Sequence, residues 1–268
     1  MPGEKAGVPA GLWTRCEGCG HMLYEKEVAD ALYVCPECGH HRRVDARTRI
    51  EQLIDPGTFE EFASDLRSTD PLKFKDRLPY KDRLKKERAK TGETEAIVVG
   101  KAFIRGRAVV LGVMNPAFIM ASMGAVVGEK VTRAVERAVE DNLPLVIVTA
   151  SGGARMQEGM VSLVQMAKTA AALARLDDAG GLYIVVATDP TTAGVAASFA
   201  GLGDVILSEP KAMIGFAGPR VIANTINAEL PEGFQTAEFM KEHGFVDRIV
   251  PRSELRQEIA RIIDYCGK

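Results

Sequence analysis

Four of the five cysteines stand in two pairs near the N-terminus, with a spacing that suits a metal ion. The pairs are Cys16 with Cys19 and Cys35 with Cys38; two residues separate the members of each pair and 15 residues separate the pairs. Zinc favours four thiolates in a tetrahedron, and this spacing is typical of zinc ribbons. Gly and His follow each pair at once, and the glycine lets the backbone turn toward the sulfurs. We therefore predict one structural zinc per chain, held by these four cysteines.

Two loops rich in small residues follow expected strands further along the chain. The first, residues 150–158, contains Gly152 and Gly153, and the second contains Ala193 and Gly194. Ligands of α/β proteins bind at the carboxyl ends of strands, and free N–H groups at a helix start suit an oxyanion. The alternative, in which both loops are merely tight turns that bind nothing, stays open on the glycine content alone.

The usual catalytic motifs are missing, which limits the chemistry of the chain. There are only four histidines, and the sequence contains no Gly-x-Ser-x-Gly, no phosphate-binding Gly-x4-Gly-Lys-Ser/Thr and no Gly-x-Gly-x-x-Gly after a strand. Arg155 and Glu158 are the ionisable residues nearest the first glycine loop, and a glutamate at a helix start is more often a partner of the helix dipole than a base. The reaction should depend on backbone donors and on a group supplied by a cofactor or substrate.

Hydrophobic periodicity predicts the elements that hold these loops. We expect strands at 96–99 with 102–104, 108–114, 145–149, 182–187 and 205–207, and helices at 128–141, after 153 and at 195–202. The turn at Arg105-Gly106 should make the first strands a hairpin. Strands that alternate with helices predict an α/β core with parallel pairing.

Composition and charge set the class of protein. The 268 residues are 46% hydrophobic with a formal net charge of −2, so no overall charge draws the chain to nucleic acid or membrane. Its apolar runs are too short to span a bilayer and its start does not resemble a secretory signal, so we expect a soluble, cytoplasmic protein. The composition changes near residue 45, which predicts a ribbon at residues 1–45 and a larger domain at 46–268.

A basic segment comes after residues 44–62, where we expect a short helix and a loop. Residues 73–90 hold nine basic and three acidic residues. Such a run is usually a solvated surface, and the alternative is an arm for an acidic partner or a phosphorylated ligand.

Several motifs resemble one known family. They are Ser151-Gly-Gly-Ala-Arg-Met-Gln-Glu158, Asp189-Pro-Thr191, Ala197-Ser-Phe-Ala200, Glu209-Pro-Lys-Ala212 and residues 214–222. Together with the four-cysteine ribbon, they are similar to the bacterial and plastid acetyl-CoA carboxylase carboxyltransferase β subunits over residues 12 to 253.

The resemblance implies a crotonase-like fold, a spiral of ββα units, behind the zinc ribbon. It implies transfer of a carboxyl group from carboxybiotin, on the biotin carboxyl carrier protein, to acetyl-CoA, which gives malonyl-CoA for fatty acid synthesis. Its partners would be the carboxyltransferase α subunit, in an α2β2 heterotetramer, and biotin carboxylase in a larger, ATP-binding complex. Biotin would come from the carrier protein, and its ureido anion would serve as the base.

Site residues carry over by motif. The backbone N–H groups of Ala193 and Gly194 would stabilise an oxyanion, and Gly152 and Gly153 would shape the other edge of the catalytic pocket. Substrate binding would involve a second set of residues: Ser151, Arg155, Ser122, Met123 and Gly124.

Two departures from the family concern the backbone. The family usually has two glycines at 193–194, and the alanine at 193 should require a loop without positive φ there. Met120-Ala121 also stands where the family commonly has Gly-Gly, which leaves room for a different acyl chain. The remaining alternatives are a carboxyltransferase for another acyl-CoA and, from a different class, a zinc-ribbon nucleic-acid-binding protein. The ribbon is not strongly basic, so we do not expect nucleic acid as the main partner.

Overall fold

The computed structural model describes residues 12–217, 222, 225 and 230–268. The chain divides between Arg43 and Val44 into two compact units. Part of the motif at 214–222 lies outside the described residues, because 218–221 are not among them.

The small unit is built around its cysteines. Strands β1 (Trp13–Arg15) and β2 (Met22–Tyr24) pair antiparallel, and α1 (Glu25–Asp30) follows at once. Among the described residues of this unit, the buried hydrophobic cluster consists of Cys16, Leu23, Val28 and Cys35. So small a core cannot supply the folding free energy of an independent unit, so a structural metal is expected to supply the rest.

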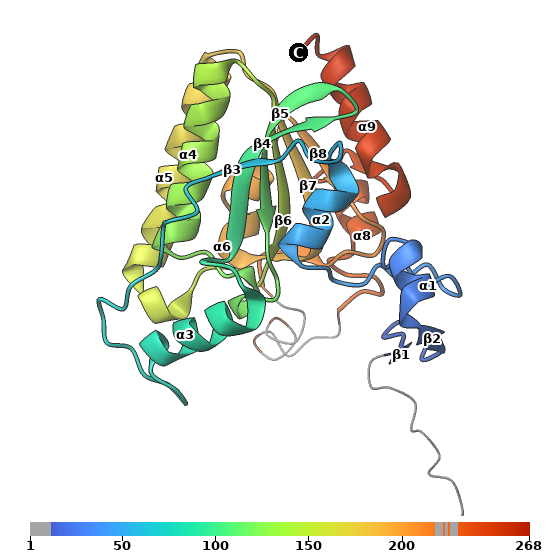
Figure 1. The fold of residues 1–268 in the computed structure, drawn as a ribbon, viewed down its shortest axis with the longest axis horizontal. Helices are drawn as coiled ribbons and strands as arrows, with labels where there is room; N and C mark the ends of the chain where they lie inside the picture. Colours follow the sequence, from blue (N-terminus) through green and yellow to red (C-terminus); the bar gives the residue numbers. More distant parts are fainter. Residues whose placement is uncertain (1–11, 218–221, 223–224, 226–229) are drawn as a thin grey trace, which may run out of the picture. The chain divides into compact units, whose positions relative to one another are not determined.

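The large unit contains one mixed sheet (Figure 1). Its strands are β3 (Glu60–Phe62), β4 (Ile97–Ile104), β5 (Arg107–Met114), β6 (Leu145–Ser151), β7 (Tyr183–Thr192), β8 (Val205–Ser208), β9 (Ile214–Gly215) and β10 (Arg248–Ile249). The order is β10-β8-β7-β6-β5-β4-β3, with β9 paired to the far end of β7. Strands β3, β4 and β5 pair antiparallel and the others parallel, so the predicted hairpin and the predicted parallel core are both confirmed.

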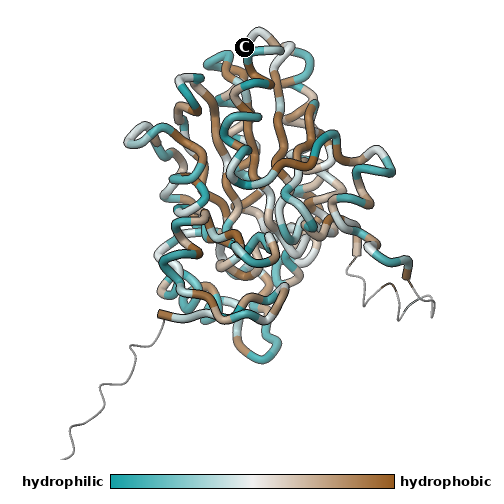
Figure 2. The backbone as a smooth tube through the Cα atoms, turned by 90° about the vertical axis from the view of Figure 1, so that its right-hand side faces the viewer, coloured by the Kyte–Doolittle hydropathy of each residue, from teal (hydrophilic) through white to brown (hydrophobic). Residues whose placement is uncertain are grey.

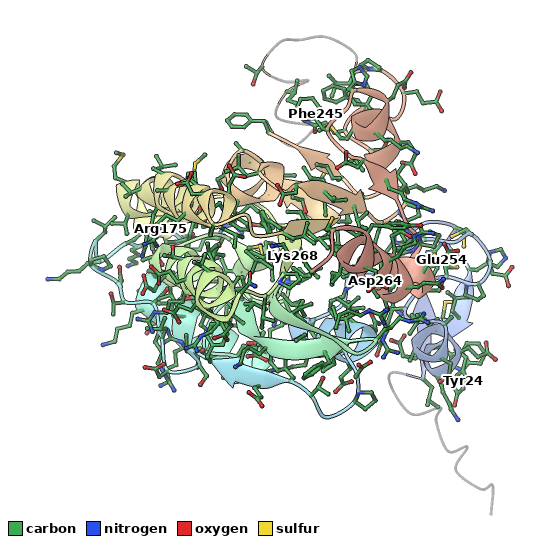
Figure 3. The ribbon with its side chains drawn as sticks, turned by 90° about the horizontal axis from the view of Figure 1, so that it is seen from above. Tyr24, Arg175, Phe245, Glu254, Asp264 and Lys268 are labelled. Atoms are coloured by element: carbon green, nitrogen blue, oxygen red, sulfur yellow. The ribbon has the colours of Figure 1, made fainter. Side chains whose placement is uncertain are left out.

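Helices cover both faces of this sheet. They are α2 (Ala46–Leu53), α3 (Tyr80–Thr91), α4 (Ala125–Asp141), α5 (Met160–Asp178), α6 (Ala193–Ala196), α8 (Ala237–Glu242) and α9 (Arg252–Tyr265), with short 3-10 turns at Ile119–Ala121, Met156–Glu158 and Phe199–Gly201. Seen from above, α4 and α5 run side by side on one face and α9, which carries Asp264, lies on the other (Figure 3). The large unit is therefore a helix–sheet–helix sandwich.

Alternation along the strands creates two separate cores. Ile147 and Val185 pack in the cluster that contains α4 and α5, whereas their neighbours Val146 and Val186 pack in the cluster that contains α2 and α9. Successive strand side chains point to opposite faces, so a strand covered on both sides must be apolar throughout. Figure 2 shows this as hydrophobic strands inside a more polar exterior. Among the described helices, none is long and apolar enough to cross a membrane.

A buried ion triad joins α2 and α9 to the end of β8. Glu209 accepts from Arg49 Nη1 at 2.7 Å and from Arg252 Nε and Nη2 at 2.7 and 2.8 Å, and all three side chains are buried. Burial alone would raise the pKa of Glu209, but the charges and hydrogen bonds of Arg49 and Arg252 lower it to about 2. The carboxylate therefore stays ionised inside the protein.

The segment after β7 differs from the sequence prediction. Strand β7 continues through Asp189-Pro190 to Thr192, and the helix expected at 195–202 is only the four residues of α6 followed by a 3-10 turn. Ser198 leaves helical geometry, with φ −133° and ψ −118°, and its Oγ donates to the Gly194 carbonyl at 2.6 Å. A side-chain bond thus replaces a backbone bond and ends the helix.

Candidate functional site

The four cysteine sulfurs of the small unit form one cluster. The Sγ atoms of Cys16, Cys19, Cys35 and Cys38 all lie within 4.8 Å of one another. The Cys16–Cys38 and Cys19–Cys35 distances are 3.7 and 3.9 Å. A tetrahedron with Zn–S bonds of about 2.3 Å has sulfur–sulfur edges of roughly 3.8 Å, so this donor set fits zinc and leaves no open position for a substrate. The predicted structural zinc site is confirmed in its ligands' arrangement.

The two glycine loops of the large unit lie against each other at the carboxyl ends of β6 and β7. The Thr192 hydroxyl donates to the Ser151 carbonyl at 3.0 Å. A Cβ placed on Gly153 would lie 2.5 Å from the Ala193 Cβ and 3.5 Å from the Gly194 nitrogen. The residues predicted for one pocket are therefore brought together, although about 40 residues separate them in the chain.

Ala193 adopts the left-handed conformation. Its φ is +52°, so the expectation that alanine would force this residue out of positive φ is wrong. Ala193 directly follows the β7–β9 pairing at Thr192–Gly215 and is itself the first residue of α6, so this junction between strand and helix holds the conformation despite the methyl group. Gly194, by contrast, does not have positive φ, and a Cβ there would meet Ala154 Cβ and Met166 Sδ at 3.3 Å each.

The amide N–H of Gly194 is the donor best placed to meet a ligand in this loop. It belongs to the first turn of α6, where N–H groups have no acceptor within the helix. The Gly152 N–H is already donated to the Met120 carbonyl at 2.9 Å and the Gly153 N–H to Ser151 Oγ at 3.0 Å. The N–H groups of these two glycines are therefore engaged in holding the loop itself.

A third loop, residues 119–124, is hydrogen-bonded to the first glycine loop. Ile119, Met120 and Ala121 have φ of +45°, +52° and +49°. Left-handed geometry at three successive residues that are not glycine costs conformational free energy, of order 1–3 kcal/mol each. Met120 is 44% exposed and its Cβ lies 3.5 Å from where a Cβ on Gly152 would be, so its side chain lies at the entrance of the glycine loop.

Most of the side chains predicted to bind substrate are not accessible. Ser151, Arg155 and Met123 have no exposed surface, and Ser122 is 8% exposed. A Cβ on Gly124 would lie 2.5 Å from the Glu158 carboxylate, so this glycine makes room for a buried charge. A substrate therefore cannot contact the side chains of Ser151, Arg155 or Met123 in this chain. For these residues we still predict either a contact through the backbone or a role in supporting the loop.

The partners of Arg155 were not predicted from the sequence. Its Nη2 lies 2.6 Å from Glu95 Oε1, and its Nη1 lies 3.1 Å from the Tyr80 hydroxyl and 3.4 Å from Glu158 Oε1. Burial alone would lower the pKa of Arg155, but Glu95 holds it above its ordinary value. The only signal in the sequence was a charged motif, Arg155 to Glu158, at the start of an apolar helix.

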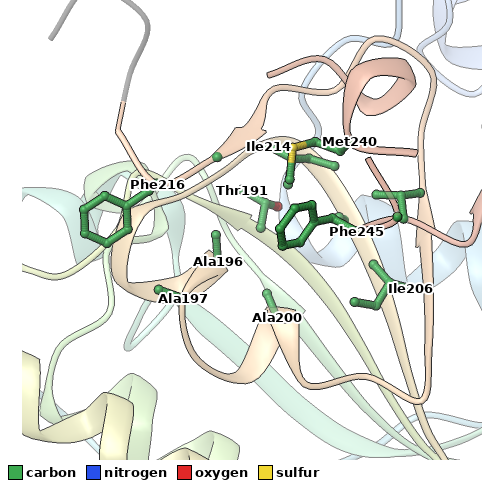
Figure 4. Close-up of a pocket in the computed structure, with 14 residues that line it drawn as sticks. Thr191, Ala196, Ala197, Ala200, Ile206, Ile214, Phe216, Met240 and Phe245 are labelled. Atoms are coloured by element: carbon green, nitrogen blue, oxygen red, sulfur yellow. The ribbon is translucent and has the colours of Figure 1, made fainter. Parts of the chain in front are cut away.

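An apolar cavity of about 370 Å³ opens on the other side of α6 (Figure 4). Its lining includes Ala196, Ala197, Ile214, Met240 and Phe245. Within the described residues that line the cavity, Thr191 is the one with a hydroxyl group and none carries a charge. This lining suits an apolar group.

Two family models match the chain. The carboxyl transferase domain model matches residues 40–265, and the acetyl-CoA carboxylase zinc finger domain model matches residues 13–38. The fold and the cysteine site together define a biotin-dependent carboxyltransferase of the crotonase-like fold with a zinc ribbon.

Curated relatives give the particular family. The acetyl-coenzyme A carboxylase carboxyl transferase subunit beta of Rhodopirellula baltica is 58% identical over 99% of this chain and 85% of that protein. The subunit of the same name from Desulforamulus reducens is 52% identical over 98% of this chain and 91% of that protein. The chain belongs to the family of acetyl-CoA carboxylase carboxyltransferase β subunits.

Solved structures agree on the fold. Transcarboxylase 12S, with methylmalonyl-coenzyme A bound, has a TM-score of 0.68 at 25% identity; the match covers 82% of this chain and 41% of that one. The malonate decarboxylase MdcD–MdcE hetero-dimer of Pseudomonas has a TM-score of 0.63 at 24% identity, over 83% and 86% of the two chains. The predicted crotonase-like architecture with an N-terminal ribbon is confirmed.

Proposed function

We propose that this chain, with a carboxyltransferase α subunit, moves a carboxyl group from carboxybiotin on the biotin carboxyl carrier protein to acetyl-CoA. Residues 1–45 would be the ribbon and residues 46–268 the carboxyltransferase domain. The assembly would be an α2β2 heterotetramer in the cytoplasm, within a larger complex that also contains the ATP-binding biotin carboxylase. The family membership over nearly the whole chain supports this function.

The observation that carries the proposed mechanism is the first turn of α6 beside Gly153. The donor at Gly194, together with Ala193, would face the negative charge that appears as the enolate of acetyl-CoA or the ureido anion of biotin forms. An N–H held in place before the reaction stabilises such charge without reorganisation. Because α6 has only four residues, the direction of the N–H matters more here than a helix dipole.

No described side chain in the glycine loops is placed to act as a general base. The histidines at 21, 40 and 41 belong to the small unit, and His243 follows α8, where its Nδ1 lies 2.8 Å from the Phe239 carbonyl. The ureido group of biotin, when the carrier delivers it, supplies the basic nitrogen. The chain's own part is to hold the acyl oxygen and to shape the pocket through Gly152 and Gly153.

Reconstitution with the α subunit tests this function. The complex, given free carboxybiotin or the carboxylated carrier, is expected to form malonyl-CoA, and acetyl-CoA is expected to outcompete propionyl-CoA. A complex that prefers propionyl-CoA would assign the chain to another acyl-CoA carboxylase. Full turnover by the β chain alone would refute the two-subunit site.

A further inference from the structure

A buried network of polar side chains underlies the loops of the site. Its charged members are Arg155, Glu95 and Glu158, and Tyr80, Ser68 and Ser122 complete it; none is more than 8% exposed. These residues come from widely separated parts of the large unit, so the network ties those parts together. We use "buried network" for these six residues.

Glu158 lies at the centre of the contacts that matter for the loops. Its Oε1 accepts from the Tyr80 hydroxyl at 2.6 Å, and its Oε2 accepts from the backbone N–H of Ala125, the first residue of α4, also at 2.6 Å. A carboxylate at the start of a 17-residue helix is stabilised by the helix dipole and satisfies a free N–H. Glu158 thus caps α4 from a distant part of the chain.

Arg155 balances the charge of the two carboxylates. Besides its bonds to Glu95 and Tyr80, it donates from Nε to Ser122 Oγ at 3.1 Å and from Nη2 to the Ser122 carbonyl at 2.7 Å. Burial alone would raise the pKa of Glu95, but Arg155 lowers it below its ordinary value, so the pair stays ionised. The positive charge of Arg155 and the positive end of the α4 dipole therefore balance the negative charges of the two buried carboxylates.

The loops above the network are bonded to each other along their backbones. Met123 N–H donates to the Gly153 carbonyl and Arg155 N–H to the Met123 carbonyl, both at 2.8 Å, and Ser151 Oγ donates to the Ala121 carbonyl at 2.7 Å. Loop 119–124 and loop 151–155 are thus held to each other by hydrogen bonds. The buried network contacts both loops through Ser122, Arg155 and Glu158.

We propose that Tyr80 and Glu158 are positioning residues for carboxyl transfer: the hydroxyl of Tyr80, at the start of α3, holds the Glu158 carboxylate that fixes the α4 start and the glycine loop. This inference rests on the proposed function. Tyr80 and Glu158 are 78 residues apart, and the basic segment 73–90 is anchored to the site through this bond. In Figure 1, α3 lies across one end of the sheet.

The phenol hydroxyl is hard to replace. Without it, Glu158 Oε1 keeps only the Arg155 contact at 3.4 Å, and Arg155 Nη1 loses a partner at 3.1 Å. The carboxylate is then free to shift toward Arg155 and away from the Ala125 N–H. Because the Ala125 N–H directly follows loop 119–124, loss of its bond to the carboxylate releases the end of that loop and, through the backbone bonds between the loops, displaces the glycine loop.

Tyr80→Phe in the β chain assembled with the α subunit tests this. We expect kcat for carboxyl transfer to fall about 10-fold, with KM for acetyl-CoA changed less than about 2-fold, because a displaced loop affects the transition state more than ground-state binding. The matched control is Tyr183→Phe, which also removes one buried hydroxyl, bonded to the Phe199 carbonyl at 2.8 Å, outside the network. It should lower Tm by a similar amount and leave kcat unchanged.

A double-mutant cycle separates positioning from general destabilisation. If Tyr80 acts through Glu158, adding Tyr80→Phe to Glu158→Gln should lower kcat little beyond the effect of Glu158→Gln alone. Should Tyr80→Phe fail to assemble, Glu158→Gln, which removes the charge that accepts from Tyr80 and from the Ala125 N–H, carries the same test of kcat against KM.

Each outcome decides the proposal. A wild-type kcat for the assembled Tyr80→Phe or Glu158→Gln variant, additive effects in the cycle, or an equal loss of kcat in Tyr183→Phe would overturn it. A wild-type complex with no carboxyl transfer would instead refute the proposed function, so the two failures are distinguishable.

Discussion

The close approach of Gly153 and Ala193 predicts that substitutions at these two positions are coupled in their effects on stability and activity. Gly153 has φ +109°, and a Cβ added to it would lie 2.5 Å from the Ala193 Cβ. The backbone strain of Gly153→Ala costs about 1–3 kcal/mol, and the overlap adds to it because no flexible side-chain end can move away. In an Ala193→Gly background the overlap disappears and the remaining neighbours of the new Cβ lie at 3.5 Å, so only the strain remains.

The cycle is read out as unfolding free energy and as activity. We expect a coupling of about 1 kcal/mol or more, in the sense that Ala193→Gly partly rescues Gly153→Ala. For a domain of this size that corresponds to roughly 2–4 °C in Tm. The activity of the complex with the α subunit should show the same rescue, because the added methyl would displace Ala193 and the Gly194 donor beside it.

A matched control uses a glycine with strain but no neighbours. Gly106, in the β4–β5 turn, has φ +80°, and no described atom lies within 4 Å of a Cβ placed there. Gly106→Ala and Ala193→Gly should therefore be additive. Additivity in the Gly153 cycle as well would show that the two glycine loops do not touch, and the geometry of the site would be wrong.

Three further predictions follow from single features. Freshly purified protein should contain one zinc per chain, and Cys35→Ala should abolish zinc binding; metal analysis well below one zinc in the wild type would contradict the ribbon. Because the folded pKa of Glu209 is depressed from 4.5 to about 2, its contribution of about 3 kcal/mol should be present above pH 4.5 and lost as the pH falls toward 2. Urea midpoints against pH for the wild type and Glu209→Gln should converge in that range, and a constant difference would exclude the triad. Ala193→Gly should leave stability unchanged or raise it by up to about 1 kcal/mol, whereas Ala171→Gly, exposed within α5, should cost about 1 kcal/mol; equal losses in thermal unfolding would mean that Ala193 is not strained.

Local patterns in the sequence predicted what local chemistry determines. The cysteine spacing predicted the zinc ligands, the apolar residues at 108–114 predicted a strand, and the β-branched run at 145–149 predicted a strand buried on both faces, because these features depend on neighbours in the chain. The turn at Arg105-Gly106 likewise identified the hairpin.

Long-range packing determined what the sequence did not reveal. The Glu95–Arg155 pair and the Tyr80–Glu158 bond join residues 60 and 78 positions apart, so no local pattern reports them. The conformation of Ala193 was predicted wrongly, because propensity disfavours positive φ for alanine, while the β7–β9 pairing and the α6 start impose it. The burial of Arg155 was also not predicted. A charged side chain is usually exposed unless it is paired, and the partners of Arg155 are distant in the sequence.

Removal of the Gly194 N–H tests the central claim, that backbone donors in this loop stabilise the oxyanion. Gly194→Pro deletes the donor, but proline also disfavours the left-handed conformation of the residue before it, so the comparison is made in an Ala193→Gly background. Gly194→Ala in that background adds the same Cβ and keeps the N–H. In the complex with the α subunit, the proline variant should have kcat about 100- to 1000-fold below that of the alanine variant, with a nearly unchanged KM for acetyl-CoA. Equal turnover by the two folded and assembled variants would contradict the claim.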